Sequence, residues 1–215
     1  MTAAVAAPGA TAGAAVALRP ARRSEAETLT MLHVAIWRET YRELAPPETV
    51  ATLDVERRLG RWREMLADPE RIVLVAEAAG GLAGFGVAGP PSDPVFGARG
   101  EVKLLYVAAG FARQGLGRRL LAALAGGLLA RGYGGLALGV VVGNDPAIAF
   151  YEALGGRRLT AYRDRGPLWR SDNLAYVWDD LPALAASAPA RAAPSPSHGL
   201  TAAGPSLSPE GRGAG

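Results

Sequence analysis

The chain contains no cysteine, and this absence removes several classes of protein at once. Disulfide frameworks, zinc sites built on cysteine and catalysis through an acyl-cysteine intermediate are all excluded. Lysine is nearly absent as well, because Lys103 is the only one and the other basic residues are arginines. The formal net charge is only +3 and is spread along the chain, which gives little support to a nucleic-acid-binding function.

Long apolar runs are also missing. The longest soft run, residues 10–18, is short and consists mostly of alanine and glycine, so the sequence predicts no membrane-spanning helix. The run lacks the basic flank of a secretory signal, and a cytoplasmic location is therefore the expectation.

Composition divides the 215 residues into three parts. Residues 1–16 show no hydrophobic period and are expected to form a disordered leader. Residues 17–182 carry the patterns of one folded domain of ordinary size. Residues 183–215 are rich in Ala, Pro, Ser and Gly and are expected to form a disordered tail.

Within the domain, hydrophobic periods and turn residues predict an alternation of strands and helices. Strands are expected at residues 17–21, 71–78, 82–89, 102–107, 136–142, 157–163 and 173–179. Helices are expected at residues 24–44, 55–67, 116–131 and 146–154. Ser24 and Glu27 have the spacing of a capping box, and Asp54 can cap the second helix. This order predicts an α+β domain with a mixed, mostly antiparallel sheet of about seven strands and about four flanking helices.

The stretch from Glu101 to Leu121 has the strongest functional pattern. A buried strand leads through a glycine-punctuated turn into a helix, so that Gly115 and Gly117 lie in the first helical turn, where backbone N–H groups lack partners. Nearby arginines and the helix dipole favour a bound polyphosphate. The alternative is an ordinary glycine-rich loop with solvated arginines. Leu120 stands where a dinucleotide fingerprint needs its third glycine, and the lysine of a P-loop is missing.

A second pattern begins at Asn144. Asp145 can cap a helix and Pro146 can be its first residue, which would leave Asn144 outside the helix with its amide free. Tyr151 then falls about a turn and a half into this helix.

Together the two patterns resemble the GCN5-related N-acetyltransferases, the GNAT family. Their first motif, Arg/Gln-x-x-Gly-x-Gly/Ala, follows a strand that ends in apolar-x-Val, and residues 105–107 and 115–117 match it. Ala112 departs from it, since arginine is displaced by one position to Arg113. Their second motif is matched by Asn144, Ala147, Phe150, Tyr151 and Gly155, with Gly156 in place of its final phenylalanine. The resemblance covers about residues 17–182.

The resemblance implies acetyl-CoA as co-substrate and no metal. The strands at 101–107 and 136–142 would be parallel neighbours that splay apart to admit the pantetheine arm, with the Val107 N–H polarising the thioester carbonyl. The positions assigned to acetyl-CoA are Leu105, Tyr106, Val107, Ala112, Arg113, Gln114, Gly115, Leu116, Gly117, Arg118 and Asn144.

Acyl transfer to an amine also needs a base and a proton donor. Tyr151 is the candidate that protonates the leaving thiolate, and Glu101 is the candidate base. The alternatives are a core tyrosine and a solvated carboxylate at a strand end. His33 is a weaker candidate base.

The acceptor is predicted only as a class. His33, Trp37 and Tyr41 share one side of a helix and form either a wall of the acceptor pocket or packed core. The predicted function is transfer of an acetyl group from acetyl-CoA directly to a primary amine of a small molecule or peptide, with no nucleic-acid or membrane partner. Homodimer formation stays open. The alternative is a non-catalytic acyl-CoA sensor or interaction module, which the two departures from the motifs would favour.

Overall fold

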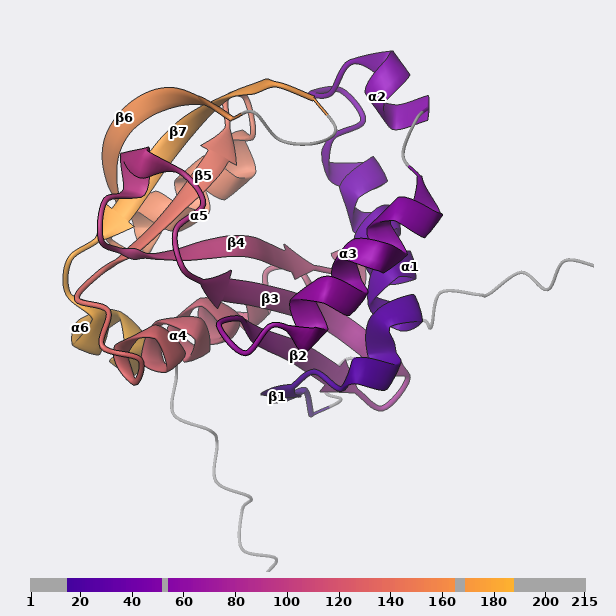
Figure 1. Cartoon of the computed structure of the whole chain (residues 1–215), viewed down its shortest axis with the longest axis horizontal. Coiled ribbons are helices and arrows are strands. Elements are labelled where there is room, and N and C mark those ends of the chain that lie inside the picture. Colours follow the sequence, from indigo (N-terminus) through magenta and orange to yellow (C-terminus); the bar gives the residue numbers. More distant parts are fainter. Residues whose placement is uncertain (1–14, 52–53, 165–168, 188–215) are drawn as a thin grey trace, which may run out of the picture.

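The computed structural model describes residues 15–51, 54–164 and 169–187. These residues form a seven-stranded sheet, in the strand order β1-β2-β3-β4-β5-β7-β6, together with the helices that flank it (Figure 1). The strands are β1 (Ala17–Pro20), β2 (Ile72–Ala78), β3 (Gly81–Gly89), β4 (Gly100–Val107), β5 (Leu136–Val141), β6 (Arg157–Asp164) and β7 (Ser171–Trp178). In this sheet β4 and β5 run parallel, whereas the other neighbouring pairs are antiparallel. The predicted mixed, mostly antiparallel sheet is confirmed.

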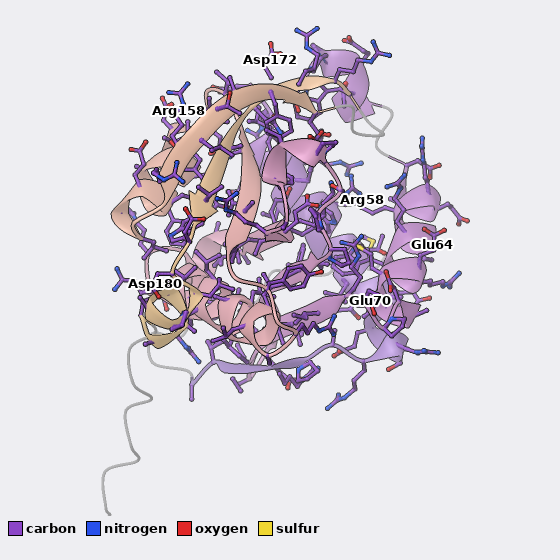
Figure 2. The ribbon with its side chains drawn as sticks, turned by 60° about the vertical axis from the view of Figure 1, so that its left-hand side comes forward. Arg58, Glu64, Glu70, Arg158, Asp172 and Asp180 are labelled. Carbon is purple, nitrogen blue, oxygen red and sulfur yellow. The ribbon has the colours of Figure 1, made fainter. Side chains whose placement is uncertain are left out.

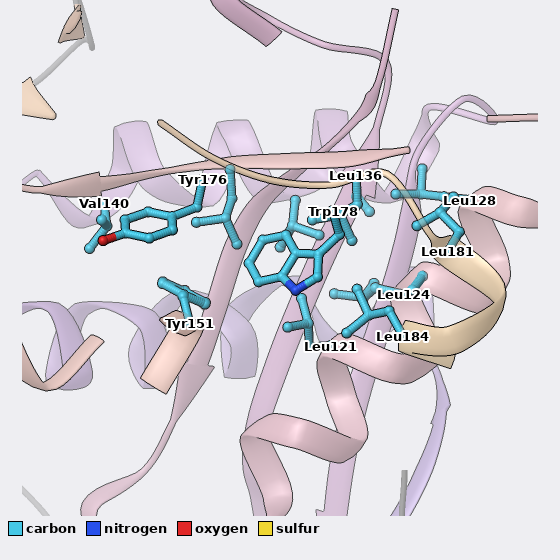
Figure 3. Close-up of a cluster of buried hydrophobic side chains, with 14 of the residues drawn as sticks. Leu121, Leu124, Leu128, Leu136, Val140, Tyr151, Tyr176, Trp178, Leu181 and Leu184 are labelled. Atoms are coloured by element: carbon cyan, nitrogen blue, oxygen red, sulfur yellow. The ribbon is translucent and has the colours of Figure 1, made fainter. Parts of the chain in front are cut away.

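Helices cover both faces of the sheet. The helices are α1 (Ala26–Thr40), α2 (Pro47–Ala51), α3 (Val55–Ala67), α4 (Leu116–Leu129), α5 (Asp145–Ala153) and α6 (Leu181–Ala186), and the 3-10 turns are η1 (Arg23–Glu25), η2 (Pro94–Phe96) and η3 (Ala109–Phe111). On one face, α1 and α3 bury Leu29 and Trp62 against Phe85 of β3. On the other face, Leu124 of α4 packs in a cluster with Trp178 of β7 (Figure 3).

Two helix boundaries differ from the prediction. The first helix begins at Ala26, after the 3-10 turn η1, and it is this turn that is capped: Glu25, not Glu27, accepts from the Arg22 amide at 2.7 Å. Glu25 is held there by the guanidinium of Arg19, 2.6 Å away. After α1 ends at Thr40, Pro47 starts the short helix α2, a role that suits proline because the first helical N–H needs no partner.

A helix occupies the beginning of the segment predicted as a disordered tail, residues 183–215. Leu181–Ala186 forms α6, in which Leu181 and Leu184 are buried against the cluster that contains α4. Its alanine-rich sequence gives little periodicity, but an Asp180 cap and these two leucines suffice to dock it. Residues 188–215 of that predicted tail, and residues 1–14 of the predicted leader, lie outside the described residues.

The pairing between β4 and β5 is short. Gly100 lies opposite Leu136 and Glu101 opposite Ala137, and beyond these two pairs the strands separate. Each strand is nevertheless anchored on its other edge, β4 along β3 and β5 along β7. The separation therefore leaves a permanent gap in the sheet without loosening either strand.

A β-bulge sits beside this gap. Val87 lies opposite Leu104 but Ala88 lies opposite Val102, so Lys103 is the extra residue on β4. The bulge breaks the strict alternation of side chains: Val102 and Leu105 both pack on the α4 face. Glu101, the residue before Val102, lies on the other side of the strand, with its carboxylate near the Lys103 ammonium.

Candidate active site

The gap exposes backbone groups of β4. The Ala108 N–H donates to the Ala83 carbonyl at 2.9 Å, so alternate residues of β4 bond to β3. Leu105 and Val107 therefore direct their N–H and C=O groups away from β3, toward β5. Because β5 has already diverged, these groups have no strand partner and are free to bind an extended ligand as an added strand would.

A cavity of about 1180 Å³ opens along the gap. This first cavity is lined by the end of α1 and the loop after it, by β4, by the turn that leads into α4, by the end of β5 and by α5. Its two ends differ in chemistry, since one lies at the N-terminus of α4 and the other reaches Tyr41 and Tyr151.

The turn into α4 is shaped to present backbone amides. Arg113 and Gly115 adopt left-handed conformations, with φ of +57° and +76°. The Arg119 amide donates to the Gly115 carbonyl at 3.1 Å, which leaves the amides of the three preceding helical residues available. Successive free amides at a helix N-terminus form a concave site for an anion such as a pyrophosphate.

Gly117 has a packing role that the sequence pattern did not reveal. A Cβ at this position would lie 3.2 Å from the ring of Phe150, which lines the same cavity. The absence of a side chain thus serves two purposes. It lets α5 pack closely on the first turn of α4, and it keeps the amides uncovered.

Most residues predicted to hold acetyl-CoA line the first cavity. They are Leu105, Tyr106, Val107, Ala112, Arg113, Gly115, Gly117, Arg118 and Asn144. The two others are placed differently: the Gln114 amide donates to the Gly110 carbonyl at 3.0 Å within the turn, and Leu116 is buried in the core. The side chains of Gln114 and Leu116 support the shape of the turn, so that only the backbone groups of these two residues can contact a ligand.

Asn144, not Asp145, caps α5. Its side-chain oxygen accepts from the Ala147 N–H, at a long 3.4 Å, and the helix begins at Asp145. The prediction that Asp145 is the cap and that the side-chain amide of Asn144 is entirely free is therefore wrong. Only its amide NH₂ end is left to donate into the cavity, because the oxygen is engaged.

Three phenols converge on the cavity from different elements. Tyr151 lies on α5, Tyr106 on β4 and Tyr41 at the end of α1, and all three line the cavity. Burial, and secondarily the nearby Tyr41 phenol, raises the pKa of Tyr151 above its usual value. Burial also raises the pKa of Tyr106, which is hydrogen-bonded to Tyr41. Burial raises the pKa of Tyr41 as well, and all three phenols therefore keep their protons at neutral pH.

Tyr151 sits where the core meets the cavity. Its ring packs 6.0 Å from Trp178 and 6.3 Å from Tyr176, at the edge of the buried cluster (Figure 3). Among the described residues, no group accepts a hydrogen bond from its hydroxyl. This arrangement fixes the ring by packing and leaves the hydroxyl proton for a bound molecule.

The predicted aromatic stripe on α1 is divided by the structure. Tyr41 lines the cavity, whereas Trp37 is buried behind it against Tyr41 and Trp169. His33 is farther inside, 4% exposed and in contact with Trp62, Phe85 and Tyr106. Burial, and then the Arg58 guanidinium, lowers the pKa of His33 to about 2. A ring so placed is poorly suited to be the base.

Glu101 lies in a second, smaller cavity of about 670 Å³. The carboxylate is 3% exposed, accepts from the Ser92 N–H at 2.6 Å and lies 3.2 Å from the Lys103 ammonium. The two cavities share Val102, Lys103 and Gly139 in their walls. Tyr151 and Glu101 thus approach the same junction of β4 and β5 from separate cavities.

Two classes of site find no support in the described part of the chain. No group of three or more His, Asp or Glu side chains is placed to hold a metal ion there. None of the helices described is both long enough and apolar enough to cross a membrane.

This chain is similar to known acetyltransferases in sequence. The model of the acetyltransferase (GNAT) family matches residues 34–156, more than half of the chain. The uncharacterized N-acetyltransferase YuaI of Bacillus subtilis (strain 168) is 28% identical over 169 residues, which cover 79% of this chain and 96% of the relative.

Solved structures share the fold. The PaiA N-acetyltransferase from Thermoplasma acidophilum, in complex with coenzyme A, is 19% identical with a TM-score of 0.61, over 77% of this chain and 99% of that one. The putative acetyltransferase yncA from Salmonella typhimurium, with acetyl-CoA, is 22% identical with a TM-score of 0.57, over 77% and 94%. At these identities the likeness shows the architecture alone.

The buried His33 predicts an acid-sensitive fold. Because its pKa is about 2 when folded and about 6.5 in an unfolded chain, the unfolded state binds the extra proton below pH 6.5. Stability is therefore lost as the pH falls from 6.5, by about 1–1.5 kcal/mol between pH 7 and pH 5.5. Urea unfolding of wild type and His33→Leu at both pH values measures this loss. We expect the variant to show a much smaller loss over this range, and equal losses in both proteins would contradict the assignment.

Proposed function

Because the chain belongs to the acetyltransferase (GNAT) family, we propose that it transfers an acetyl group from acetyl-CoA directly to a primary amine. The observation that carries this proposal is the gap between β4 and β5, where the backbone of Leu105 and Val107 faces an open cavity. Two proteins with this fold hold coenzyme A or acetyl-CoA, which supports the choice of acyl donor.

The cavity offers one group of contacts for each part of that donor. The free amides of the turn into α4, with Arg113 and Arg118 beside them, suit the pyrophosphate. The exposed edge of β4 suits the amide-containing pantetheine arm, and the NH₂ group of Asn144 can donate to it from the opposite wall. The departure at Ala112 costs little in this arrangement, because backbone N–H groups do most of the binding.

The chemistry requires no covalent enzyme intermediate, in keeping with the absence of cysteine. The neutral amine nitrogen attacks the thioester carbonyl, the new C–N bond forms, and the C–S bond then breaks. An N–H of β4 that faces the gap, that of Val107 in the first instance, stabilises the oxyanion. Tyr151 gives its proton to the departing thiolate, and the surplus proton of the attacking nitrogen returns to the Tyr151 phenolate as the amide forms. A raised phenol pKa is tolerable here, because the same desolvation makes the thiolate more basic.

Glu101 is proposed as the base that removes a proton from the incoming ammonium. Its carboxylate is held by the Ser92 amide and by Lys103, and it reaches the junction of the two cavities. Because it lies across β4 from the first cavity, the acceptor would enter from the second cavity and meet the thioester at the shared wall. Trp37 then serves to position Tyr41 by packing, and His33 packs against Tyr106.

Removal of the Tyr151 hydroxyl tests the proton donor. In a thiol-release assay with acetyl-CoA and a panel of amines, Tyr151→Phe should lower kcat by about 100-fold or more, the usual contribution of a general acid. Tyr176→Phe is the matched control, because it removes a neighbouring buried hydroxyl that donates to Glu152 outside the first cavity. Normal turnover by Tyr151→Phe would exclude the assigned role. If acetyl-CoA binds but no amine causes release of thiol, the result would favour the alternative function, a non-catalytic acyl-CoA sensor or interaction module.

The base is tested by the pH dependence of Glu101→Gln. The amide oxygen can still accept from Ser92, so the fold should be kept while the proton acceptor is lost. We expect kcat/KM to fall by about 100-fold near pH 7, and the loss to shrink at high pH, where the free amine is already neutral. The kcat/KM–pH profile of wild type and variant measures this. An acid limb identical in both would remove Glu101 as the base.

A further inference from the structure

The second cavity contains more polar groups than a base alone requires. Its walls come from five separate segments: the loop around η2, the start of β4, the middle of β5, the end of β6 and the start of β7. It meets the first cavity at Val102, Lys103 and Gly139. Gly139 matters here because a side chain on it would overlap the hydroxyl of Tyr162, which forms part of the wall.

Acidic side chains outnumber basic ones in the walls of this cavity, with Asp93, Glu101 and Asp164 against Lys103 and Arg163. Lys103 is paired with Glu101 at 3.2 Å, and Arg163 is paired with Asp172 at 2.9 Å. The two other carboxylates of the wall, Asp93 and Asp164, have no basic partner within the described residues. One oxygen of Asp93 accepts from the Val95 amide, which fixes the orientation of the carboxylate but leaves its charge uncompensated.

Three carboxylates line this cavity together with the Tyr162 phenol: Asp93, Glu101 and Asp164. Burial raises the pKa of Tyr162 to about 12, and the charges of Asp164, Glu101 and Asp93 each add to the rise. The cavity is therefore a region of negative potential whose low-dielectric walls strengthen its attraction for a cation.

An unsatisfied buried acceptor lies in the same wall. Asn173 is 4% exposed, and its side-chain oxygen has no hydrogen-bond partner, while its nitrogen is 3.5 Å from the Tyr162 oxygen. A buried acceptor without a donor is costly, so such groups are usually paired in the functional state. A ligand that brings N–H donors would satisfy it, and an ammonium group carries three.

We propose that the second cavity holds the distal ammonium group of a diamine acceptor, a short aliphatic chain with an amino group at each end. The proposal rests on the acetyltransferase function and names the substrate class of that site. One ammonium is held by Asp93, Asp164 and the oxygen of Asn173. The chain places the other nitrogen at the junction beside Glu101, where it loses its proton and attacks the thioester.

Other acceptors fit this cavity less well. A monoamine would leave the two carboxylates, Asp93 and Asp164, without a cationic partner and the Asn173 oxygen without a hydrogen-bond donor. An amino acid would bring its own carboxylate into a region that is already negative. The second cationic end therefore accounts for features that a base and an oxyanion donor do not use.

Steady-state acetylation of three amines of similar length tests the proposal: 1,5-diaminopentane, pentylamine and 6-aminohexanoate. We expect kcat/KM for the diamine to exceed that for pentylamine by about tenfold or more, with 6-aminohexanoate the poorest. The preference should decrease as salt is raised from 20 mM to 500 mM, because the second ammonium is recognised by charge. Equal kcat/KM values for the diamine and pentylamine would overturn the proposal.

Two isosteric substitutions connect the preference to the cavity. Asp93→Asn keeps an oxygen for the Val95 amide, and Asp164→Asn keeps the volume, so both should fold. Each should bring the diamine-to-pentylamine ratio of kcat/KM down toward one. Glu64→Gln, on the outer side of α3 away from the cavity (Figure 2), removes the same charge and should leave the ratio unchanged. A ratio that survives both aspartate substitutions would place the recognition elsewhere.

Binding without turnover separates this proposal from the proposed function. Isothermal titration of the full chain with 1,5-diaminopentane in the absence of acetyl-CoA should give binding that Asp164→Asn weakens. If this binding is found but no amine is acetylated, the cavity assignment stands and the catalytic function fails. If amines are acetylated without preference and the diamine does not bind, the function stands and the diamine site is excluded.

Discussion

The structure depends on an incomplete strand pairing. β4 and β5 meet at two residue pairs and then diverge, while β3 and β7 secure their outer edges. A strand edge with free N–H and C=O groups is normally covered or defended, since it binds other chains readily. Here the edge opens into a cavity between helices, so that it is accessible to an extended ligand of the right width. Two further features can act on such a ligand because they lie at the ends of this gap: the turn into α4 with its free amides, and the three phenols.

The bulge at Lys103 lies in the wall that the two cavities share. By adding one residue to β4, it lets Val102 join the core beneath α4 while Glu101 is directed to the cavity formed with β6 and β7. The acyl donor and the acceptor can therefore approach one junction from separate cavities. In a regular strand Val102 and Leu105 would lie on opposite faces, whereas the bulge places both of them on the α4 face.

Sequence reasoning succeeded where the signal was local. The strand, turn and helix around Gly115 and the helix after Asn144 have short-range patterns, and the predicted fold class and acetyl-CoA chemistry follow from them. Boundaries that depend on tertiary contacts were missed: the Arg19–Glu25 pair moved the start of α1, and Leu181 docked a helix in an alanine-rich segment. The second cavity could not be predicted, because Asp93, Tyr162 and Asn173 come from distant segments whose meeting depends on the insertion of β7 between β5 and β6.

The most direct test of the account is amide hydrogen exchange along β4, measured by NMR with and without saturating acetyl-CoA. Alternate residues serve as internal controls, since the strand bonds to β3 only at every second position. We expect the amides of Leu105 and Val107 to exchange fast in the free protein and to become protected in the complex, whereas the Tyr106 amide should be slow in both. Unchanged exchange at Leu105 and Val107 in the presence of bound acetyl-CoA would contradict the claim that the gap between β4 and β5 is the donor site.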